Sequence, residues 1–190
     1  MSKKGRRPRK DLQPPEPEEG MVWIKTEPSL DGSTYVVTVE VSEDRAILLT
    51  PETSPRYALT ILQAIARAEY DAAVFKQLGA IIPDQRAVAE LIVDLRKDRP
   101  DIDTSATKPL EIEPGVNSKG KPFLSVLIDG EKVGQWTMAD ARKHALVAME
   151  AVVVADLDSG YYRALNGLVG LDEGRARNVV DDLQYYREKI

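Results

Sequence analysis

Few side chains in this sequence have the types and spacing that chemistry requires. The chain has one histidine, His144, and no cysteine, which excludes disulfides, thiol catalysis and thiolate-bound zinc. One imidazole does not form a transition-metal site, and a general base needs a nucleophile and an orienting group beside it. We therefore expect a non-enzymatic protein with no catalytic residue, metal site or cofactor, and His144 as a partly exposed helix residue.

Two pairs of acidic residues occur in similar helical contexts, Glu69 with Asp71 and Asp156 with Asp158. Paired carboxylates bind cations in some proteins and cleave glycosidic bonds in others. Residues two apart on a helix point about 200° away from each other, so neither pair converges on one ion in an unbroken helix. We predict that these acids face solvent, or that they cap a helix that restarts near residues 158–160.

Charge is distributed unevenly between the N-terminus and the rest of the chain. Residues 2–10 hold six basic side chains and no acid, which leaves 20 basic against 31 acidic residues elsewhere, a net charge of −11. A basic segment beside an acidic body can contact nucleic-acid phosphates, an acidic protein or that body, or act only as a solvated tail. The candidate nucleic-acid arm consists of Lys3, Lys4, Arg6, Arg7, Arg9 and Lys10.

Adjacent tyrosines occur twice near the C-terminus, as Tyr161-Tyr162 and Tyr185-Tyr186. Neighbouring residues on a helix lie about 100° apart, so one member of each pair is expected to be partly exposed. An exposed tyrosine offers both an apolar ring and a hydroxyl to a partner. These four residues form the candidate partner surface, with core and rim packing as the alternative.

Several function classes lack support in the sequence. No apolar run approaches the roughly 18 residues that cross a bilayer, and a proline- and glutamate-rich stretch follows the basic N-terminus where a secretory signal would need an apolar segment. The glycine positions match neither the Walker pattern nor Gly-x-Gly-x-x-Gly. We expect a cytosolic protein that has no membrane contact.

The elements that carry these residues are repeated along the chain. Residues 35–78 align with residues 122–165 at a constant shift of 87, and one extra residue then carries the alignment to Arg99 and Arg187. Identical pairs at this shift include Val39 and Val126, Ala58 and Ala145, Leu59 and Leu146, and Asp71 and Asp158, while His144 aligns with Tyr57. An internal duplication is the simplest explanation, because chance similarity does not keep one register across apolar and charged positions together.

The fold class predicted from this alignment is α+β, a tandem duplication of a β-β-β-α-α unit behind a disordered N-terminal tail. Its parts are the tail at 1–20, a first repeat at 21–99, a linker at 100–108 and a second repeat at 109–190. Residues 1–20 are too rich in charge and proline to order themselves by burial. Segments rich in β-branched and aromatic residues predict strands at 22–27, 35–41, 46–49, 110–113, 123–128 and 133–136.

Helices are expected after each set of strands. Long alanine-rich helices end near Leu78 and Leu165, and shorter helices begin near Asp84 and Asp172. A three-stranded meander needs a cover on one face. The long helices supply it, and their broad apolar stripes, which include Leu62 and Met149, predict that each is covered on two sides about a pseudo-twofold axis.

Two segments carry a resemblance to other proteins. These are Asp129-Gly130-Glu131-Lys132-Val133-Gly134-Gln135-Trp136-Thr137, which leads into an alanine-rich helix, and Gly170-Leu171-Asp172, which opens a second helix. In both segments the chain resembles uncharacterised small accessory proteins of actinobacteria and their phages. The resemblance implies a phage-encoded accessory protein of the host cytosol, and it implies no particular activity or site residue.

Three functions are compatible with the sequence. The first is an interaction protein that binds a host or phage protein through an acidic helical face or the exposed tyrosines, with a homo-oligomer also compatible. The second is nucleic-acid binding, in which the basic arm contacts phosphates. The third is an enzyme or small-ligand site in a cleft between the repeats.

Overall fold

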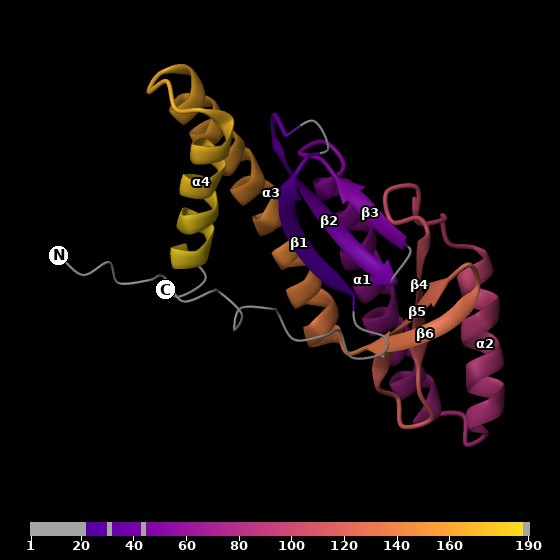
Figure 1. Ribbon diagram of the computed structural model, residues 1–190. Coiled ribbons are helices and arrows are strands. Elements are labelled where there is room, and N and C mark those ends of the chain that lie inside the picture. Colours follow the sequence, from indigo (N-terminus) through magenta and orange to yellow (C-terminus); the bar gives the residue numbers. More distant parts are fainter. Residues whose placement is uncertain (1–21, 30–31, 43–44, 188–190) are drawn as a thin grey trace.

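The computed structural model describes residues 22–29, 32–42 and 45–187 (Figure 1). This part of the chain is a mixed α+β structure with two three-stranded antiparallel sheets and four helices. The elements are β1 (Trp23–Pro28), β2 (Tyr35–Ser42), β3 (Arg45–Leu49), α1 (Ser54–Gly79), α2 (Gln85–Lys97), β4 (Leu110–Val116), β5 (Pro122–Ile128), β6 (Glu131–Trp136), α3 (Met138–Gly167) and α4 (Glu173–Arg187). Each sheet has its strands in chain order, β1-β2-β3 and β4-β5-β6.

The strands form where alternate residues are apolar, because successive side chains point to opposite faces of a sheet. Along β2 the buried apolar residues are Tyr35, Val37, Val39 and Val41. A hairpin joins β5 and β6, and its two central residues, Asp129 and Gly130, have φ angles of 51° and 81°. Positive φ at both central residues is what a tight type I′ turn requires.

Polar side chains cap the N-termini of three of the helices. The Thr137 hydroxyl accepts a hydrogen bond from Asp140 N at 3.2 Å at the start of α3. Asp84 accepts one from Arg86 N at 2.9 Å before α2, and the Asp172 carboxylate accepts one from Arg175 N at 3.0 Å before α4. These caps satisfy backbone N–H groups that have no partner inside the helix. Those at Asp84 and Asp172 confirm the predicted starts of α2 and α4.

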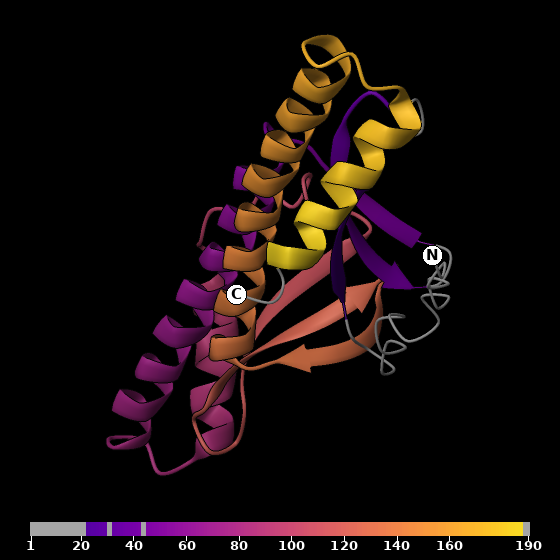
Figure 2. The same ribbon diagram turned by 60° about the vertical axis from the view of Figure 1, so that its left-hand side comes forward.

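The long helices form one layer, and both sheets lie on the same side of it (Figure 2). Helix α1 packs on β4 and β5, whereas α3 packs on β1 and β2, so each long helix covers strands from the other half of the chain. Small buried residues such as Ala58 and Ala145 allow α1 and α3 to approach each other closely. One continuous apolar core therefore joins the two halves, with α2 packed on α1 and α4 on α3.

Candidate binding surfaces

Asp71 is a buried carboxylate, with none of its surface exposed. Its Oδ2 atom lies 2.8 Å from Arg96 Nε, and its Oδ1 atom lies 2.7 Å from Arg99 Nη2. The Arg99 guanidinium also lies over the Tyr70 ring, 5.0 Å from its centroid. A buried carboxylate is tolerated when ion pairs such as these neutralise its charge. The cluster of Asp71, Arg96 and Arg99 therefore stabilises the contact between the end of α2 and α1.

The prediction that both acidic pairs face solvent was wrong for one member of each. Asp158 is 1% exposed and accepts a hydrogen bond from Gln184 at 2.8 Å, whereas Glu69 and Asp156 are exposed. A restart near 158–160 was wrong too, because α3 is continuous there. The two-residue spacing correctly predicted that the members of each pair lie on different sides of their helix. It could not predict that α2 covers Asp71 and that α4 covers Asp158.

His144 lies at the contact between α1, α3 and β6. Its Nε2 atom and the Tyr57 hydroxyl share a hydrogen bond of 2.7 Å, and its ring packs against Trp136 with centroids 4.6 Å apart. Burial lowers the pKa of His144 to about 4 and raises the pKa of the Tyr57 hydroxyl above its ordinary value. The hydrogen bond between the neutral His144 ring and the buried Tyr57 hydroxyl links α3 to α1. In a catalytic triad the histidine would instead contact a serine and a carboxylate.

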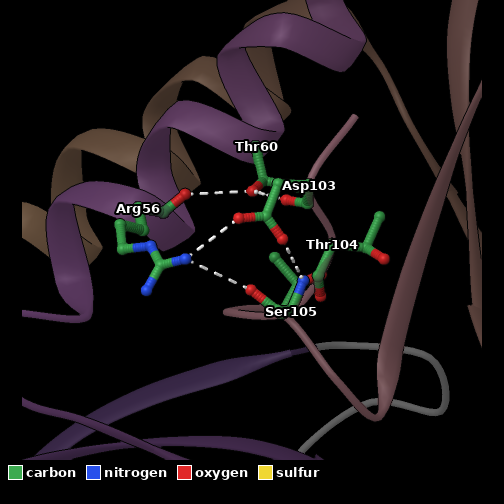
Figure 3. Close-up of polar contacts among 6 residues, drawn as sticks. Arg56, Thr60, Asp103, Thr104 and Ser105 are labelled. Carbon is green, nitrogen blue, oxygen red and sulfur yellow. Dashed lines mark hydrogen bonds and ion pairs between the residues drawn. The ribbon is translucent and has the colours of Figure 1, made fainter. Parts of the chain in front are cut away.

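The linker between the two halves is held against α1 by polar contacts (Figure 3). Arg56 Nη2 donates to the Asp103 carboxylate at 3.0 Å, and the Thr60 hydroxyl donates to the Asp103 carbonyl at 2.7 Å. Hydrogen bonds from Ser105, together with Arg56, lower the pKa of Asp103 to about 2. Arg56 and Asp103 are both well exposed, so the cluster orders the linker and forms no enclosed site.

A small hollow of about 280 Å³ lies between α1, α2 and the β4–β5 hairpin. Its lining consists of Phe75, Ala89, Ile92, Val93, Arg96, Gly115, Val116 and Phe123. Arg96 is already paired with Asp71, and the other lining side chains are apolar. Ala89 aligns with Arg177 in the second half, where the longer side chain reaches across and donates to the Gly32 carbonyl at 3.3 Å. No nucleophile or carboxylate lines this hollow.

The candidate tyrosines fall into different environments. Tyr161 is 53% exposed on α3, while its neighbour Tyr162 is buried in the core, as the offset of about 100° predicts for one pair. Tyr185 is half-buried on α4. The side chain of Tyr186 lies outside the described residues, as do all six residues of the basic arm. The structure therefore places Tyr161 alone of this set on an open surface in the described part of the chain.

Large apolar side chains are exposed along α1 and α3, on sides of these helices that the sheets do not cover. We define the central patch as Leu59, Leu62, Leu146, Met149 and Val153, whose exposed fractions are 53%, 40%, 64%, 43% and 62%. The distal stripe continues along α3 and just beyond it, and consists of Leu157, Tyr161, Leu168 and Val169, exposed by 53%, 53%, 88% and 65%. Leu62 and Met149, which were expected in the covered stripes, are exposed, because the sheet, the partner helix and the short helix cover other sides of each long helix.

Comparison with known proteins gives no assignment. No family, curated protein or solved structure matches this chain. The described helices include none that is long and apolar enough to cross a membrane. No group of three or more histidine, cysteine, aspartate or glutamate side chains in the described part of the chain is arranged to hold a metal ion.

Proposed function

We propose that this chain is a non-enzymatic interaction protein, a phage-encoded accessory protein of the host cytosol, that binds a host or phage protein through the distal stripe. The observation that carries the proposal is the exposure of Leu157 and Tyr161 on α3 and of Leu168 and Val169 just beyond it. Leu157 and Tyr161 are four residues apart, so they share one side of α3, and Leu168 follows seven residues later at the C-cap. Contiguous apolar surface of this kind marks protein-binding sites, and a central tyrosine is a common anchor in them.

The net charge of the chain outside the arm indicates the charge of the residues that surround the partner's apolar binding site. That part of the chain carries −11, and like charges facing each other across an interface oppose binding. Asp156 is exposed next to Leu157 at the start of the distal stripe. A partner with an apolar centre and basic residues around it fits this surface best.

We also infer that the two halves arose by internal duplication. The support is that both halves have the element order β-β-β-α-α and sheets with strands in chain order. In addition, Tyr57 and His144, which align at the shift of 87, touch each other across the helix pair. Equivalent residues meet in this way where a twofold axis passes through an interface.

Affinity capture with the full chain as bait tests the distal stripe. We expect the wild-type chain to recover a partner from host lysate and the Tyr161→Asp variant to recover at least about tenfold less, because a charge at an anchor position typically costs 2 kcal/mol or more. Ile81→Asp is the matched control, since Ile81 is an equally apolar residue, 78% exposed, beyond α1. Equal recovery of that partner by all three chains would refute the assignment of the surface.

Nucleic-acid binding through the arm is the alternative, and the six basic residues without an acid in positions 2–10 favour it. We expect weak, sequence-independent binding to duplex DNA that falls with salt, with a log–log slope of about −0.9 per contacted phosphate. Deleting residues 1–10 should remove most of that slope and leave protein binding intact. Tight, sequence-selective binding by the truncated chain at physiological salt would instead make nucleic-acid recognition the primary function.

A further inference from the structure

The central patch is built from equivalent positions of the two long helices. At the shift of 87, Leu59 aligns with Leu146 and Leu62 with Met149, and all four side chains are exposed. The long helices α1 and α3 lie side by side with the sheets on one side of them (Figure 2). Leu59 and Leu62 are three residues apart on α1, as are Leu146 and Met149 on α3, so each exposed pair lies on one side of its helix. An isologous contact uses the same surface on both copies, and a patch to which both long helices contribute apolar side chains can serve as such a surface.

The size of the patch matches what a dimer needs. The exposed fractions of its five side chains correspond to on the order of 500 Å² of apolar surface, which is within the range of the largest apolar patches on monomers, and such patches are often functional. A standard interface buries about 800 Å² per partner, of which roughly 56–65% is apolar. The central patch therefore supplies about the apolar area that one partner contributes to such an interface.

Charge around the patch suits a second copy better than an oppositely charged partner. Arg142 and Lys143 are exposed on α3, as are Glu69 on α1 and Glu150 on α3, and Arg142 Nη2 lies 2.6 Å from Glu69 Oε1. Both signs are therefore present near the patch, whereas the chain outside the arm has a net charge of −11. A face with mixed charges can meet its own copy without the repulsion that the rest of this acidic chain would cause.

We propose that the occupant of the central patch is a second copy of this chain, so that two helix pairs pack face to face and the four sheets lie outside them. The distal stripe continues from the central patch along α3, and the two assignments are distinguished by variants placed at Leu146 and at Tyr161. Repulsion between two acidic bodies is screened by salt over about 8 Å at physiological ionic strength. Added salt should therefore strengthen the dimer, opposite to its effect on phosphate binding by the arm.

Sedimentation equilibrium of the full chain tests the proposal. We expect a monomer–dimer equilibrium at concentrations up to about 100 µM, and a dissociation constant raised at least about 30-fold by Leu146→Asp. Tyr161→Asp, in the distal stripe, should leave the dimer unchanged. Wild-type chain that stays monomeric over this range, or a dimer that tolerates both Leu59→Asp and Leu146→Asp, would overturn the proposal.

Cross-linking provides a second measurement that does not depend on how well a charged variant folds. The chain has no cysteine, so Leu146→Cys introduces a single thiol into the central patch. A short bifunctional thiol reagent should link copies of this variant and leave copies of Ile81→Cys unlinked. Equal linking of the two variants would place the contact between copies elsewhere.

Discussion

Replacing Asp71 with alanine should lower the free energy of unfolding by about 3–5 kcal/mol, because it leaves Arg96 and Arg99 partly buried without their shared carboxylate. Glu69→Ala is the matched control. Glu69 lies two residues earlier on the same helix and pairs with Arg142, but both side chains are more than 40% exposed. Exposed pairs contribute at most about 1 kcal/mol. Urea denaturation followed by circular dichroism measures both variants.

The comparison shows whether Asp71 stabilises the contact between α2 and α1 or acts as an ordinary surface ion pair. If α2 is held to α1 through Asp71, the variant should also expose the amide protons of α2 to faster exchange than those of α4. Similar losses of stability for Asp71→Ala and Glu69→Ala would contradict the role assigned to the buried cluster.

The protein should lose about 3 kcal/mol of stability through His144 as the pH falls from 6.5 to 4. Burial lowers the pKa of His144 from 6.5 to about 4, so in this window the unfolded chain binds a proton that the folded chain does not. The contribution of His144 to the free energy of unfolding is fully present above pH 6.5, declines between pH 6.5 and pH 4, and changes no further below pH 4. The magnitude follows from about 1.4 kcal/mol for each pKa unit.

Comparison with His144→Gln isolates this contribution from that of the acidic side chains. Glutamine keeps a polar group for the Tyr57 hydroxyl and does not titrate, so the difference in unfolding free energy between the two proteins should change by about 3 kcal/mol between pH 7 and pH 4. Unfolding measured in denaturant at several pH values gives this difference. A constant difference across that range would show that His144 does not stay neutral in the folded protein.

Local patterns in the sequence predicted most of the secondary structure. Segments rich in β-branched and aromatic residues located β2 and β5. Asp84 and Asp172 located the starts of α2 and α4. These features depend on residues close together in the chain, since a cap or a two-residue turn is decided by its own backbone conformation and neighbouring side chains.

The sequence by itself therefore determined the α+β class and the order of strands and helices. It also determined that the two members of a pair such as Glu69 and Asp71 lie on different sides of their helix. Only the tertiary structure decided that each long helix covers the sheet of the other half, that Arg96 and Arg99 reach Asp71, and that Leu62 and Met149 remain open. The reason is physical. An amphipathic pattern records that one side of a helix is apolar, but the surface that covers it is chosen by the packing of residues distant in the chain.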